Sequence, residues 1–202
     1  MKKGSEVMPT YYIDMETTGL NELDNKIITI QYAELKRELG KNEHGEEVWI
    51  NSAQMVEPLT ILKEWESDEK TILKKFFQDS GILDPYTFSF VGLGYNLQFE
   101  QKFLWQRAMT NGLKPINLLS KPFIDLHTVG ILMNKGEFRG SGMDKITNKP
   151  HDGKIVVDWY NQGNYKNIET YIKNETENFL QLYGWLLDKM PNLLDEFKNN
   201  PK

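Results

Sequence analysis

Two acidic side chains near the start of the chain have a spacing that suits a metal site. Asp14 and Glu16 lie at the end of a short apolar run, YYIDM, and the turn-forming residues TTG follow them. On a strand, positions i and i+2 point to the same side, so both carboxylates would face one site. Carboxylate oxygens suit hard cations such as Mg²⁺ and Mn²⁺. A solvated strand end is the alternative, because Asp-x-Glu also arises by chance in an average composition.

Two later segments carry an acid on a predicted helix. Glu100 falls in the first turn of one helix, where acids interact favourably with the helix dipole, and Asn96 stands where an N-cap is expected. Tyr171 and Glu175 are four residues apart, so on a second helix they share one face about 6 Å apart. A phenol and a carboxylate placed in this way can hold one water molecule between them. Each segment taken alone is also compatible with a purely structural role.

Apolar periodicity predicts the elements that must bring these residues together. Five short β-prone runs predict strands at residues 11–15, 27–35, 48–56, 87–93 and 122–127. Helical spacing predicts helices over residues 59–82, 96–112 and 167–190, and then a short helix, NLLDEF, after Pro191. Residues 134–154 are rich in Gly, Lys, Asn and Pro and predict an irregular segment with a helical turn near Met143. This order predicts an α/β fold with a mixed five-stranded sheet, three antiparallel strands and then parallel strands, flanked by helices.

Length and composition limit the classes of protein that the chain can belong to. Its 202 residues predict one domain, residues 10–202, after a polar tail over residues 1–9. The chain has no cysteine, which excludes a disulfide scaffold, a thiolate zinc site and cysteine nucleophiles. His44, His127 and His151 lack metal-ligand spacing. No run approaches the roughly 20 apolar residues of a membrane span, and no secretory signal is visible, so a cytoplasmic protein without a membrane partner is expected.

Charge alone does not predict broad coating of nucleic acid. The chain has 24 Lys and Arg against 29 Asp and Glu, a formal net charge of -5. This mild acidity is unfavourable for binding phosphates over a wide surface. It is compatible with a nucleic-acid enzyme in which metal ions neutralise an acidic site.

Taken together, the three acidic segments resemble the motifs of the DEDD superfamily of 3′→5′ exonucleases. YIDMETTGL is similar to the first motif, Asp-x-Glu-Thr-Thr-Gly-Leu, and VGLGYNLQFEQKFL resembles the second, usually Asn-x-x-Phe-Asp. YIKNETENFLQLY resembles the third motif of the tyrosine subgroup, usually Tyr-x-x-x-Asp, whereas the histidine form would place His at Thr170. GKIVVDWYNQGNYKNIETY also resembles exonuclease domains related to family B DNA polymerases. The motifs come in the family's order, and the resemblance spans about residues 10–187.

The resemblance implies a ribonuclease H-like fold and a metal-dependent exonuclease acting on single-stranded DNA or RNA 3′ ends. Two Mg²⁺ or Mn²⁺ ions about 4 Å apart are the implied cofactors. Asp14 would bridge both ions, and Glu16 and Glu175 would complete the shell of the first. Glu100 would act on the second ion through water. Tyr171 would orient the attacking water, because a phenol with a pKa near 10 is a poor base at neutral pH.

Residues around the acids are candidate contacts for nucleic acid: Thr17, Thr18, Gly19, Leu20, Asn96 and Phe99. Leu20 would wedge beside the terminal base and Phe99 would stack or pack under it, although both residue types are also common in a core. Asn96 would hold the sugar–phosphate or cap its helix. Asp125 would support the site or make a structural hydrogen bond. A basic stretch is either a phosphate track or a solvated loop, and it contains Lys135, Arg139, Lys145, Lys149 and Lys154.

The chain departs from the family at two of its four acids. Glu100 and Glu175 stand where the family has Asp, so each carboxylate extends one methylene further. Mg²⁺ requires near-octahedral ligand geometry, so a displaced ligand weakens a site unless a shifted helix absorbs the added length. Two hypotheses follow: an active exonuclease, or a catalytically degraded nucleic-acid-binding or scaffold protein on the same fold. An endonuclease on a ribonuclease H-like scaffold is a third.

Overall fold

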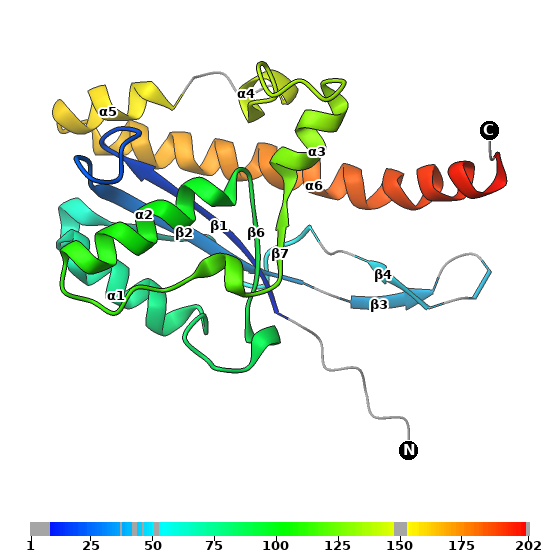
Figure 1. Cartoon of the computed structure of the whole chain (residues 1–202), viewed down its shortest axis with the longest axis horizontal. Helices are drawn as coiled ribbons and strands as arrows, with labels where there is room; N and C mark the ends of the chain where they lie inside the picture. The colour runs from blue at the N-terminus through cyan, green and yellow to red at the C-terminus, as the bar shows by residue number, and fades with distance from the viewer. Residues whose placement is uncertain are drawn as a thin grey trace.

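A mixed five-stranded sheet forms the centre of the molecule (Figure 1). The computed structural model describes residues 9–36, 38–41, 44–45, 47–50, 53–147 and 153–200. The strands run in the order β5-β2-β1-β6-β7. Their bounds are Thr10–Thr17 (β1), Ile27–Leu35 (β2), Thr60–Lys63 (β5), Val91–Gly94 (β6) and Phe123–Asp125 (β7). β1 and β5 pair antiparallel with β2, while β1 with β6 and β6 with β7 are parallel, which confirms the predicted mixed α/β sheet.

The third strand of the sheet is not the predicted one. Residues 48–50 belong to β4 (Glu47–Ile50), which pairs with β3 (Glu38–Lys41) in a separate two-stranded sheet, and residues 51–52 lie outside the described part. The sheet is instead completed by β5, inside the stretch predicted as helix from residue 59. The helix begins only at Glu69, because the Asp68 side chain accepts a 2.7 Å hydrogen bond from the Thr71 amide and caps it.

The described helices are α1 (Glu69–Asp79), α2 (Leu97–Thr110), α3 (Leu126–Met133), α4 (Met143–Ile146), α5 (Lys154–Asn161) and α6 (Tyr165–Asn199). The single turn α4 confirms the helical turn predicted near Met143. Residues 87–89 form a 3₁₀ turn rather than the start of a strand, and α3 begins inside the strand predicted over 122–127. α6 continues through Pro191, where it was predicted to end. One proline removes a single helical hydrogen bond, and the Leu, Met and Lys residues around it favour helix.

Side-chain alternation along β1 assigns its acids to one face of the sheet. Ile13 and Met15 pack with Phe76 of α1 and Phe103 of α2. Tyr12 points the other way and packs against Phe179 of α6, with ring centroids 4.8 Å apart. Figure 1 shows these two layers, with α5 and α6 along the upper side of the sheet and α1 and α2 below and in front of its strands. Positions 14 and 16 are in phase with Tyr12, so their carboxylates lie on the α6 side.

Residues 1–8 of the predicted polar tail lie outside the described residues, so the division into a tail and one domain stays a prediction. Among the described residues, no helix combines the length and apolar character needed to cross a membrane.

A buried ion pair joins the two helices under the sheet. The Glu69 carboxylate accepts two 2.8 Å hydrogen bonds from the Arg107 guanidinium, one from the Ile27 amide and one from Asn111. We expect Glu69→Ala to lower the free energy of unfolding by about 3 kcal/mol, because it leaves the largely buried Arg107 without its acceptor. Urea denaturation measures this change.

Asp188 provides the matched control for Glu69→Ala. Its ion pair with Lys189 is largely exposed, so Asp188→Ala should change the free energy of unfolding by less than about 0.5 kcal/mol. Equal losses in the two variants would contradict a stabilising role for the buried pair.

Candidate metal centre and nucleic-acid cavity

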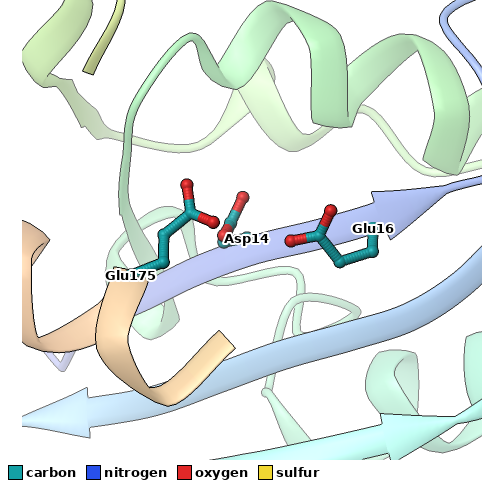
Figure 2. Close-up of side chains that lie close together, drawn as sticks. All are labelled: Asp14, Glu16 and Glu175. Atoms are coloured by element: carbon teal, nitrogen blue, oxygen red, sulfur yellow. The ribbon is translucent and has the colours of Figure 1, made fainter. Parts of the chain in front are cut away.

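Three carboxylates converge above the sheet. Asp14 and Glu16 project from β1 and Glu175 from α6 into the same space (Figure 2). One oxygen from each lies within 4.8 Å of the others. Negative charges this close repel one another unless a proton or a cation lies between them. The donor set consists of oxygen ligands alone, and therefore fits a hard divalent cation.

Asp14 is held in place by a chain of buried polar groups. Gln31 lies opposite it in the β1–β2 register and donates a 3.0 Å hydrogen bond to Oδ2. Thr29 in turn donates to the side-chain amide oxygen Oε1 of Gln31 at 3.0 Å. The Tyr12 hydroxyl donates to the same Oδ2 at 3.3 Å and accepts from Thr176 of α6. These contacts fix the orientation of the carboxylate before any ligand arrives.

Glu100 brings a fourth acid to the site from the first turn of α2. Its side chain is only 3% exposed, and Oε2 has no hydrogen-bond partner among the described residues. Burial raises the pKa of Glu100 well above its usual range, and the negative charges of Asp14 and Asp125 raise it further. A buried oxygen without a partner is costly, so this carboxyl is suited to hold a proton or to face a cation.

The raised pKa of Glu100 predicts a pH-dependent stability. In the metal-free protein the folded state holds this proton more tightly than the unfolded chain does, so the free energy of unfolding falls as pH rises above about 4. Glu100→Gln cannot ionise. We expect the variant and the native protein to be equally stable near pH 4, and the variant to be the more stable of the two at pH 8.

Urea denaturation in EDTA at several pH values measures this difference. Glu137→Gln, at an exposed position, is the control and should show no such trend. A constant difference between Glu100→Gln and the native protein across the pH range would rule out a raised pKa at Glu100.

Tyr171 lies one turn before Glu175 on α6, as the four-residue spacing requires. Burial and the charges of Glu175 and Glu16 raise its pKa, so the phenol stays protonated at neutral pH. The Trp159 ring of α5 packs edge-on against it at 6.2 Å, and a Cβ on Gly153 would lie 3.5 Å from its hydroxyl. Gly153, immediately before α5, and Trp159, within α5, therefore hold the phenol beside the acids.

A cavity of about 290 Å³ opens beside the acidic cluster. It brings together ten of the eleven predicted site residues: Asp14, Glu16, Thr17, Gly19, Leu20, Asn96, Phe99, Glu100, Tyr171 and Glu175. Leu20 is 77% exposed and is therefore not a core residue, whereas Phe99 is partly buried and packs against Phe103 at 4.8 Å. Both apolar side chains thus line the cavity.

Thr18 is the predicted residue that does not line this cavity. Its hydroxyl donates to the Asn25 side chain at 3.3 Å and accepts from the Lys26 amide at 3.0 Å. A Cβ on Gly19 would lie 2.6 Å from the Asn25 side chain, so a larger residue there would displace Asn25. Thr18 therefore shapes the loop after β1, while its neighbours Thr17 and Gly19 form the cavity wall.

Asp125, not Asn96, caps the helix that carries Glu100. The Asp125 carboxylate accepts hydrogen bonds from the amides of Asn96 at 2.8 Å, Leu97 at 3.0 Å and His127 at 3.0 Å. It joins the starts of α2 and α3, which supports the structural alternative for Asp125. Asn96 has a left-handed backbone, with φ of 66°, and its side chain makes no capping hydrogen bond. Asn96 therefore lines the cavity without serving as the side-chain cap predicted as its alternative role.

Sequence reasoning missed residues that reach the acids only through the fold. A second cavity of about 260 Å³ shares Asp14, Tyr95, Asn96, Gly153 and Glu175 with the first and adds His127 and Asp144. His127 makes a 2.9 Å hydrogen bond with Ser141, and Tyr95 donates to the Ser141 carbonyl. No spacing in the sequence signals these contacts, because they join α3 and the β6–α2 connection to the loop before α4.

The predicted basic track reaches the site at one described position. Lys154, at the start of α5, lines the first cavity, whereas Lys145 pairs with the adjacent Asp144 at 2.9 Å. Lys149 and His151 lie outside the described residues. A phosphate-binding role for the rest of the track stays a prediction.

The fold is ribonuclease H-like, and solved structures share it. No protein-family model matches the chain, and no curated protein matches its sequence. A zinc-bound complex of E. coli exonuclease I with single-stranded DNA is similar, with a TM-score of 0.59 and 9% identity over 96% of this chain. The metal-free form of that complex is similar too, with a TM-score of 0.55 and 9% identity over 96% of this chain. This chain spans 43% and 42% of the length of those two chains, and at this identity the likeness shows the fold alone.

Proposed function

We propose that this protein is a metal-dependent 3′→5′ exonuclease of the tyrosine DEDD type that shortens single-stranded DNA or RNA. The convergence of Asp14, Glu16 and Glu175 within 4.8 Å carries this proposal. The buried Glu100 and the phenol of Tyr171 line the same cavity. The resemblance to E. coli exonuclease I, whose complexes contain single-stranded DNA and, in one form, zinc, supports it at the level of the fold.

The residues divide between holding cations and positioning the nucleic acid. Asp14, Glu16 and Glu175 would hold a first divalent ion, and Glu100 would face a second. When bound, such ions acidify water and stabilise the charge that develops on the scissile phosphate. Leu20 and Phe99 would contact the terminal base through apolar surface. Such contacts do not depend on which base is present. Lys154 adds a positive charge to an otherwise acidic cavity.

Tyr171 is proposed to orient the attacking water rather than to accept its proton. Its raised pKa keeps the phenol protonated throughout the neutral range. We expect Tyr171→Phe to slow hydrolysis about tenfold to a hundredfold through lost orientation. The pH at which the rate rises should not move, because the phenol does not titrate there. A shifted pH profile, measured from single-turnover rates between pH 6 and 9, would show that Tyr171 is a base.

The central experiment tests activity, direction and class together. The protein is incubated with 5′-labelled single-stranded DNA or RNA, with either Mn²⁺ or EDTA. The proposal predicts a ladder of products shortened from the 3′ end with Mn²⁺, no products with EDTA, and an intact closed single-stranded circle. Cleavage of the circle would indicate an endonuclease. Binding of the oligonucleotides without any hydrolysis would assign the chain to the catalytically degraded class.

A further inference from the structure

The apolar stripe of α6 continues beyond the body of the molecule. Along the body it is buried, at Ile168, Ile172, Phe179, Tyr183 and Leu186. At the same helical spacing it then becomes exposed, at Met190, Leu193, Leu194 and Phe197. Figure 1 shows this end of α6, in orange and red, extending past the sheet. A stripe that is buried along most of a helix and exposed over its last turns indicates a surface that another chain covers.

An apolar groove runs beside the start of this exposed stripe. It has a volume of about 570 Å³, and its walls come from β7, α3 and α6: Ile124, Leu126, Val129, Tyr183, Leu186, Leu187, Met190, Pro191 and Leu194. Phe197 lies just beyond the groove and is 78% exposed. The exposed Phe197 side chain and an apolar groove that could accept such a ring therefore lie next to each other along α6. Such a self-complementary pair is what a two-fold symmetric interface requires.

Charges beside the stripe favour one orientation of two such helices. Lys189 and Glu196 are seven residues apart and lie on the same edge of the stripe. In a parallel pair of copies, equal residues lie level with each other, so Lys189 is level with Lys189 and Glu196 with Glu196. In an antiparallel pair centred between Asn192 and Leu193, Lys189 is level with Glu196 of the second copy, and this happens twice by symmetry. Charges flanking an apolar seam select the partner orientation in this way.

We propose that two copies of this chain associate through the C-terminal turns of α6, antiparallel, with Phe197 of each copy in the groove of the other. The centre between Asn192 and Leu193 brings Phe197 close to Leu187 of the second copy, at the groove. Lys189 exchanges its exposed pairing with Asp188 for a contact with Glu196 of the second copy. The interface lies away from the acidic cluster and does not depend on the proposed function.

Sedimentation equilibrium of the full chain over a range of concentrations tests this association. We expect a monomer–dimer equilibrium, and we expect Phe197→Glu to raise the dimer dissociation constant at least tenfold. Leu83→Glu, at an exposed leucine far from α6, should leave it unchanged. A protein that is monomeric at all concentrations, or a dimer indifferent to Phe197→Glu, would overturn the proposal. If the protein is monomeric at all concentrations, the exposed stripe binds a partner other than a second copy of this chain.

Charge reversal tests the orientation separately. Lys189→Glu and Glu196→Lys should each weaken the dimer, because each brings like charges together twice. The double variant restores the opposite-charge pairs and should return the dissociation constant to within about threefold of the native value. A double variant that is weaker than both single variants would overturn the antiparallel arrangement. Circular dichroism confirms that each variant keeps its helices.

Discussion

Asp14→Asn is expected to reduce Mn²⁺-dependent trimming by at least about a thousandfold while leaving the fold intact. Asp14 lines both cavities at the acidic cluster, and its oxygen lies within 4.8 Å of those of Glu16 and Glu175. Loss of this charge removes a ligand that the proposed cations share. A metal ion contributes several kcal/mol to stabilising the developing charge, and each 1.4 kcal/mol is worth a factor of ten in rate.

The substitution is conservative for the structure around it. Asn has the shape of Asp, and its side-chain oxygen can still accept the hydrogen bonds that Gln31 and Tyr12 now donate to Asp14. Single-turnover rates on a 5′-labelled oligonucleotide at saturating Mn²⁺ measure the effect, and calorimetry with Mn²⁺ should show the loss of binding. Asp195→Asn, at an exposed position on α6, serves as the control and should keep the native rate. An Asp14→Asn variant within tenfold of the native rate would exclude the proposed site.

The local geometry of the site was predictable because it depends on the two-residue period of a strand and the 3.6-residue period of a helix. Asp14 and Glu16 share a face because they are two apart on β1, and Tyr171 and Glu175 share one because they are four apart on α6. These spacings are properties of single elements. They identify the acids without knowledge of the register that brings the elements together.

The supporting contacts were not predictable, because they depend on pairing between distant segments. Gln31 reaches Asp14 only through the β1–β2 register, and Asp125 caps α2 only because β7 lies beside β6. The edge strand β5 was missed because Leu59 and Leu62 fit a helical stripe as well as a strand. A short apolar run carries too little periodicity to separate the two.

Glu175→Asp restores the residue that the family usually has, yet it is expected to slow trimming about a hundredfold. The Glu175 carboxylate reaches the cluster from α6, with one oxygen within 4.8 Å of those of Asp14 and Glu16. Removal of one methylene withdraws it by about 1.5 Å, the length of one C–C bond. A misplacement of about 1 Å in a catalytic site can cost a hundredfold in rate. Glu177→Asp, on an exposed face of the same helix, is the matched control. If Glu175→Asp instead trims as fast as the native protein or faster, the longer reach of Glu175 is not required, and the placement proposed for this ligand is wrong.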